Sequence, residues 1–188
     1  MLGLGEEQAP QRLSFGASLS RYAGVLRNPL SIRIYAVVAV EGALSFGVFP
    51  LVAPLMVEHA LGDAVEAGLV IGAFAIGGAF YAFAVPVLVR RLGLRAMAGL
   101  GAVLGVLFIG AAVQSHLSVV IALFTAGGFA FYMIHNVLQI LATELAPEAR
   151  GSAAALFASA FFVGQAVGAV ALAHLAAITG AAAVFAIA

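Results

Sequence analysis

Five long apolar runs dominate this chain, and each is long enough to cross a lipid bilayer as a helix. A spanning helix needs about 20 mostly apolar residues, and none of these runs has a lysine or arginine in its interior. The runs predict an all-α, multi-pass membrane helix bundle. A sixth apolar run occupies residues 181–188, which as a helix would extend only about 12 Å, so we expect that helix to be incomplete. The five full-length helices are expected at residues 31–57, 67–89, 96–113, 117–141 and 151–176.

The composition excludes several other classes of protein. Hydrophobic residues make up 64% of the chain and charged residues 9%, whereas about a quarter of an ordinary soluble domain is charged. A net charge of zero argues against a nucleic-acid partner, because no excess of basic residues is available for phosphates. Cysteine is absent, which removes thiolate metal sites, and no phosphate-binding glycine loop is present. We therefore expect no metal and no cofactor.

Enzymatic signatures are also missing from the sequence. A serine hydrolase would carry a Gly-x-Ser-x-Gly motif, and none occurs. Paired aspartates for metal-dependent chemistry are impossible because Asp63 is the single aspartate. The expectation is a protein that is not an enzyme.

All eight basic residues are arginines, and they fall on one side of the expected membrane. Arginine near helix ends is retained in the cytoplasm. The N-terminus is therefore expected on the inner side of the cytoplasmic (inner) membrane. The acidic loop with Glu58, Asp63 and Glu66 is then outside. The arginines precede the first helix or lie between the second and third or the fourth and fifth: Arg12, Arg21, Arg27, Arg33, Arg90, Arg91, Arg95 and Arg150.

Residues 1–30 are expected to form a cytoplasmic segment ahead of the bundle at 31–188. Residues 1–12 are polar and glycine-rich, so we expect them to be disordered. Asn28 and Pro29 then favour the start of a helix, as N-cap and first-turn proline. Between residues 12 and 28, apolar residues at helical spacing predict a short helix on the inner membrane surface: Leu19, Tyr22 and Leu26.

A few polar side chains lie inside the apolar runs, where they are costly and often functional. Glu41 is eight residues past Arg33, about 12 Å inside the membrane. His135 is eight residues before Thr143 and therefore lies at a similar depth. With neighbours on the same helix faces, they predict a polar site capable of proton exchange: Glu41, Ser45, Tyr132, His135, Asn136 and Gln139.

The alternative is purely structural bonding, in which Glu41 pairs with His135 or Gln139 only to satisfy buried groups. Two further polar residues, Tyr81 and Gln165, are interpreted as packing partners.

Glycines spaced four apart favour close helix packing in lipid. Such pairs occur in the second, third and fifth expected helices, and each could pack within one bundle or against a second bundle: Gly68 and Gly72, Gly101 and Gly105, Gly164 and Gly168. Pro50 and Pro54 remove two backbone donors and should kink or loosen the first helix, either for packing or for gating.

Four stretches resemble parts of the C-terminal half of a major facilitator superfamily transporter. The opening at 21–29 looks like the linker into that half. The run Arg90-Arg91-Leu92-Gly93-Leu94-Arg95 resembles the superfamily's loop signature D-R-x-G-R-R, and Arg150, between the fourth and fifth helices, is a further cytoplasmic loop residue. It departs at the aspartate, where Arg90 stands, which puts the helix-capping salt bridge in doubt. The stretches 131–139 and 146–151 are similar to bacterial sugar or drug efflux members.

The resemblance implies a six-helix half built from two inverted three-helix repeats. Its first and fourth helices would line a central path, and its second and fifth would face the other half through Gly68, Gly72, Gly164 and Gly168. The implied function is proton-coupled efflux, or antiport, of a small organic solute. In this function an N-terminal transporter half would be the partner of this chain. The alternatives are a half-size protein that works as a homodimer and a non-transporting membrane subunit or assembly partner.

Overall fold

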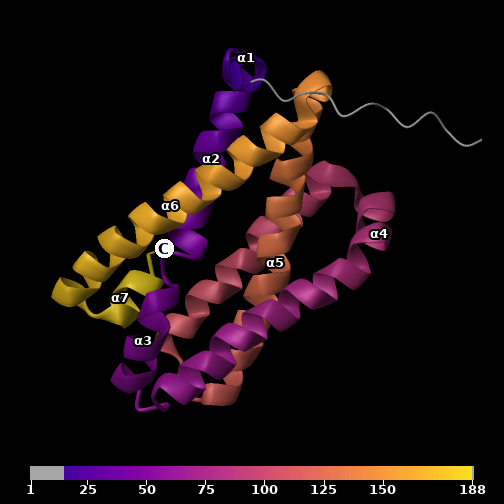
Figure 1. The fold of residues 1–188 in the computed structure, drawn as a ribbon. Coiled ribbons are helices and arrows are strands. Elements are labelled where there is room, and N and C mark those ends of the chain that lie inside the picture. Colours follow the sequence, from indigo (N-terminus) through magenta and orange to yellow (C-terminus); the bar gives the residue numbers. More distant parts are fainter. Residues whose placement is uncertain (1–14, 188) are drawn as a thin grey trace, which may run out of the picture.

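The computed structural model describes residues 15–187, which are helical without a strand (Figure 1). The predicted all-α class is therefore confirmed. The expected disordered segment 1–12, with Arg12, and the last residue, Ala188, lie outside the described residues. The elements are α1 Phe15–Leu26, α2 Pro29–Ser45, η1 Phe49–Leu51, α3 Val52–Glu58, α4 Ala64–Ile109, η2 Gly110–Val113, α5 Leu117–Glu144, η3 Pro147–Ala149, α6 Arg150–Thr179 and α7 Ala181–Phe185.

Helix α4 joins two of the expected helices, 67–89 and 96–113, without the expected loop at 90–95. Its 46 residues would extend about 69 Å if straight, more than twice the apolar thickness of a bilayer. The helix instead folds back at Gly93, whose φ of 73° and ψ of 167° are non-helical. Glycine adopts this positive φ without strain. Two arms, 64–92 and 94–109, therefore lie in the fold (Figure 1).

The helix expected at 31–57 is interrupted in the structure. Helix α2 ends at Ser45, and the chain resumes as η1 with Pro50 in its first turn and then as α3 with Pro54. A proline lacks the N–H that an uninterrupted helix needs. This break agrees with the expected loosening at the two prolines. Among the described residues, four segments are long and apolar enough to span a membrane: Pro29–Glu58, Ala64–Val106, Leu117–Glu144 and Pro147–Thr179.

The predicted helix start at Asn28 and Pro29 is confirmed. The Asn28 side-chain oxygen accepts a hydrogen bond of 3.0 Å from the Leu30 backbone N–H, and Pro29 occupies the first turn of α2. Just before it, α1 packs against α2 and α6 and buries Val25. Leu19 remains exposed on the other side of α1.

The bundle consists of two helix pairs joined by a cluster of aromatic rings. Helix α2 packs along α6, and α4 packs along α5. Phe46, just past α2, has its ring centroid 5.2 Å from that of Phe131 on α5 and 5.3 Å from that of Phe161 on α6. The rings of Phe108, Phe124 and Phe185 extend the cluster to α7. Burial of these large rings supplies packing between the pairs.

Figure 1 shows how the two ends of the bundle differ. Helix α1, the α5–α6 junction and the fold-back of α4 lie toward one end, which is uppermost in the view. Helix α3, the start of α4 and the start of α5 lie toward the other, with α7 beside α3.

Candidate functional site

Glu41 on α2 and His135 on α5 meet where the two helix pairs adjoin. The His135 Nδ1 atom lies 2.9 Å from Glu41 Oε2. The Glu41 side chain is 9% exposed and that of His135 is 19% exposed. Of the two structural pairings considered for Glu41, the structure therefore contains the one with His135 and not the one with Gln139. A hydrogen bond between these two groups can carry a proton in either direction.

Aromatic rings from two helices hold the His135 ring in place. Phe131 stacks on it with ring centroids 5.0 Å apart, and Phe157 and Phe161 approach at 4.9 and 5.0 Å. Phe157 and Phe161 lie on α6, so the imidazole is wedged between α5 and α6 while it contacts α2. This packing leaves the ring little rotational freedom and directs Nδ1 toward the carboxylate.

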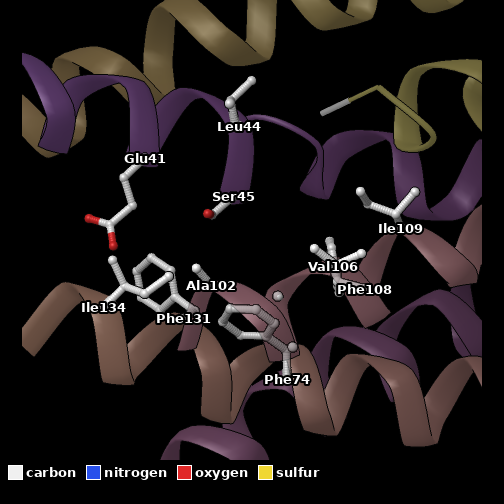
Figure 2. Close-up of a pocket in the computed structure, with 12 residues that line it drawn as sticks. Glu41, Leu44, Ser45, Phe74, Ala102, Val106, Phe108, Ile109, Phe131 and Ile134 are labelled. Carbon is white, nitrogen blue, oxygen red and sulfur yellow. The ribbon is translucent and has the colours of Figure 1, made fainter. Parts of the chain in front are cut away.

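A first cavity of about 260 Å³ opens beside Glu41. Figure 2 shows the side chains of Glu41 and Ser45 projecting from α2 into this space. The second carboxylate oxygen, Glu41 Oε1, is buried and has no hydrogen-bond partner among the described residues. The remaining lining is apolar and comes from α2, both arms of α4, and α5: Leu44, Phe74, Ala102, Gly105, Val106, Phe108, Ile109, Gly127, Phe131 and Ile134.

A second cavity, of about 580 Å³, lies between the first arm of α4 and α5. Helix α5 contributes four of the predicted residues, which are polar or aromatic: Tyr132, His135, Asn136 and Gln139. Helix α4 contributes small or apolar residues and one phenol: Ala75, Gly78, Ala79, Ala82, Val85 and Tyr81. His135 thus lines the second cavity while its partner Glu41 lines the first.

Tyr81 belongs to this group, although its sequence position was interpreted as simple packing. Its hydroxyl accepts a hydrogen bond of 2.7 Å from Asn136 Nδ2, and its ring lies parallel to that of Tyr132 at 6.3 Å. The available signal was chemical, since a phenol inside an apolar span must find a partner. Which partner it finds depends on the rotation of α4, which the sequence does not reveal.

The six predicted residues therefore divide between two cavities. Glu41 and Ser45 line the first, and the four residues of α5 line the second. The Glu41–His135 hydrogen bond is the link between the two groups. Gln139 lies at the exposed edge of its cavity.

The arginine motif is found on the surface around the fold-back of α4. Arg90, Arg91 and Arg95 are exposed on helical backbone on either side of Gly93, and Arg150 is exposed at the start of α6. None of them forms an ion pair with a described residue. This agrees with the missing aspartate of the motif.

The glycine pairs have different neighbours. A Cβ added at Gly68 or Gly72 would meet nothing within 4 Å, so this face of α4 is open. A Cβ at Gly164 would collide with the backbone of Ala39, and one at Gly168 with that of Ala43. The second pair therefore packs against α2 inside this chain. The expectation that it faces another half is not met, because a glycine face already in backbone contact has no room for a further helix.

At the other end of the bundle, Glu58 joins the end of α3 to the start of α7. Its two carboxylate oxygens accept hydrogen bonds from the backbone N–H groups of Ala181 at 2.7 Å and Ala182 at 3.0 Å. The next residue, His59, places Nδ1 2.6 Å from the Gln114 carbonyl oxygen. Glu58 therefore acts as a tertiary cap for the otherwise unpaired N–H groups that begin α7.

The two cavities are lined by apolar side chains together with one carboxylate, one imidazole, two amides, two phenols and one serine hydroxyl. Within residues 15–187 no group of three or more histidine, aspartate and glutamate side chains could hold a metal ion. Glutamate and histidine are the side chains whose proton affinities can be brought together by burial and pairing.

Comparison with known proteins gives one match. The family model of the Major Facilitator Superfamily matches residues 34–188. A search of the curated proteins and a search of the solved structures returned no match to this chain.

Proposed function

The chain belongs to the major facilitator superfamily of membrane transporters, and from this premise we propose that it exports a small organic solute by proton-coupled antiport. The Glu41–His135 pair is the element that exchanges the proton. The lining of the two cavities contacts the solute and water. The lipid bilayer is the protein's surroundings, and the solute and H⁺ are its small partners.

One observation carries this proposal. The hydrogen bond between Glu41 and His135 spans the junction of the two helix pairs and has a different cavity on each side. A structural bond alone would be expected to satisfy both carboxylate oxygens, because a buried unpaired acceptor costs about 1 to 3 kcal/mol. Glu41 Oε1 is buried and has no partner among the described residues. We interpret it as the atom that receives a proton from the first cavity.

The pair can bind zero, one or two protons, with net charges of −1, 0 and +1. In an apolar span the neutral, one-proton form has the lowest desolvation cost. That proton can reside on either Glu41 or His135, because one hydrogen bond joins the two groups. Loss of the proton leaves a net charge of −1, which weakens the bridge between α2 and α5. Such a charge-dependent bridge would couple protonation to the separation of the helix pairs.

The same arrangement supports an orientation. Helix α1, the start of α2, the fold-back of α4 and the α5–α6 junction lie toward one end of the bundle (Figure 1), and the described arginines lie in or next to these segments. We place this end in the cytoplasm and the acidic end outside, in the inner membrane. A cysteine introduced at Asp63 should label with an impermeant thiol reagent from outside intact cells, and one at Arg95 should not. Labelling at position 95 contradicts this orientation.

The open face of α4 supports a partner bundle. Gly68 and Gly72 are exposed and have no neighbour within 4 Å of an added Cβ. Small residues of this kind let another helix approach closely in lipid. We propose that an N-terminal half or a second copy of the chain covers this face.

Glu41→Gln tests the proton site. Glutamine keeps the shape and the hydrogen bonds but cannot exchange a proton. In the assembled transporter reconstituted in vesicles, the pH-driven component of flux should fall to background, while folding and insertion remain. The measurement is solute flux with and without a pH gradient, alongside the melting temperature.

Glu144→Gln is the matched control, since Glu144 is exposed at the end of α5 and has no described ion-pair partner. Its flux should equal that of the unaltered protein. If Glu41→Gln keeps its pH-driven flux but loses thermal stability, the pair has a structural role only and the proposed function fails.

A further inference from the structure

The second cavity has a chemistry that bears on the kind of solute it can hold. No aspartate, glutamate, lysine or arginine lines it. Its titratable side chains are Tyr81 on α4 and Tyr132 and His135 on α5, and His135 is already paired with Glu41. A charged solute in this cavity would lose water without gaining an opposite charge from this chain.

The polar groups that remain are one donor beside one acceptor. Asn136 uses its Nδ2 group to donate to the Tyr81 oxygen at 2.7 Å. The Tyr81 O–H proton and the Asn136 Oδ1 atom are left without a partner among the described residues. The two atoms belong to one bonded pair, so their spacing is fixed by the 5% exposed Tyr81 side chain. A hydroxyl or amide group of a solute could bind both of them at once.

The walls of the cavity are flat and apolar. Tyr132 is 36% exposed, and its ring lies over Gly78, where a Cβ would strike it. The opposite wall consists of small residues, chiefly Ala75, Ala79 and Ala82. An aromatic face of this kind packs well on a ring but gains little from a flexible chain.

We propose that this cavity binds an uncharged, ring-bearing solute, with the ring on Tyr132 and a hydroxyl or amide group on the Tyr81–Asn136 pair. This rests on the proposed transport function and specifies the substrate class at the same site. Sugar rings and aromatic amides both carry this chemistry, and the experiment distinguishes them. Tyr81 acts as a specificity residue for the uncharged polar group.

Equilibrium dialysis of the full chain in lipid nanodiscs, at one pH and without a gradient, tests the proposal. One probe series keeps a pyridine ring and changes its charge: nicotinamide, the nicotinate anion and the N-methylnicotinamide cation. The other compares methyl glucoside with the glucuronate anion. The uncharged member of one series should bind saturably, and its charged analogues at least about tenfold more weakly. Equal or tighter binding of a charged analogue, or no saturable binding by either uncharged probe, overturns the proposal.

Tyr81→Phe removes the hydroxyl and keeps the ring. It should weaken binding of the uncharged probe about 3- to 10-fold, the usual range for one neutral hydrogen bond. Tyr35→Phe is the matched control, because the Tyr35 hydroxyl donates to the Ala153 carbonyl at 3.3 Å, between α2 and α6. Equal affinities in these two variants overturn the role of Tyr81. If Tyr81→Phe fails to fold, the charge series on the unaltered chain remains decisive for the substrate class.

The two proposals can fail separately. Selective binding of an uncharged probe, together with flux that ignores Glu41→Gln, removes the proton site and keeps the substrate class. Loss of pH-driven flux in Glu41→Gln, together with equal binding of charged and uncharged probes, does the reverse.

Discussion

The packing contact between α2 and α6 (the α2–α6 seam) and that between α4 and α5 (the α4–α5 seam) both contain glycines packed against backbone. The α4–α5 seam also opens around a cavity. In the α2–α6 seam, Gly164 and Gly168 bring the two backbones into direct contact. The α4–α5 seam does the same where Gly128 meets the backbone of Phe74. Further along α5, however, Tyr132 and its polar neighbours hold the helices around a cavity of about 580 Å³.

The difference shows where close helix packing is replaced by a cavity lined with polar side chains. In lipid, helices associate through close van der Waals contact, because the apolar solvent gives no hydrophobic drive. A cavity in a seam loses those contacts, and buried polar groups add a desolvation cost. The α2–α6 seam keeps close backbone contact at Gly164 and Gly168, and it buries the Tyr35 hydroxyl in a hydrogen bond to the Ala153 carbonyl. The α4–α5 seam accepts both costs in the segment that carries Tyr81, Asn136 and His135.

The largest effect is expected from Gly164→Ala, in the closed seam. The added Cβ would strike the Ala39 carbonyl group, which is helix backbone and cannot move aside. Overpacking of this kind costs about 1 to 3 kcal/mol. The melting temperature in lipid or mild detergent should fall clearly, and expression should fall with it. Gly128→Ala should behave similarly, since its neighbour is the Phe74 backbone; an unchanged melting temperature in both variants would break the comparison.

A smaller loss of stability is expected from Gly78→Ala, where the α4–α5 seam opens. Here the neighbour is the Tyr132 ring, a side chain that can swing into the cavity. Alanine also favours the helix by up to about 1 kcal/mol over glycine, which offsets part of the strain. The melting temperature should change little, while dialysis should show weaker binding of the uncharged probe. A collapse as large as that of Gly164→Ala would mean that this part of the seam is closed as well.

Gly72→Ala is the control for both substitutions. Its Cβ would meet nothing within 4 Å, so only the helix preference of alanine acts on the isolated chain. Stability should stay the same or rise slightly. A marked fall would show that the open face of α4 is packed in the folded chain.

Sequence reasoning located the polar site by depth but could not resolve its contacts. Counting residues from the arginine side placed Glu41 and His135 at one level, and the structure brings them within 2.9 Å. The N-cap at Asn28 was equally predictable, because a cap depends on adjacent residues. Both results depend on counting residues within a single helix at a time.

Features that depend on the rotation of one helix against another were not predictable. A G-x-x-x-G pair signals close contact but not its direction, so the sequence leaves open whether Gly164 and Gly168 pack within this bundle or against another, and the structure packs them against α2. The hydrogen bond of Tyr81 could not be predicted, because its partner, Asn136, is 55 residues away in the sequence. The fold-back at Gly93 replaced an expected loop because a single residue with φ of 73° sufficed to reverse the helix.

The tertiary cap at Glu58 joins residues that are synthesised far apart in time. Its carboxylate accepts hydrogen bonds from Ala181 and Ala182, 123 and 124 residues further along the chain. Synthesis proceeds from the N-terminus, so the first spanning segment enters the membrane long before those N–H groups exist. Until α7 emerges, Glu58 has to remain hydrated at the membrane boundary. The capping bonds can therefore form only after residues 59–180 have been synthesised, which makes them a late contact within the described bundle.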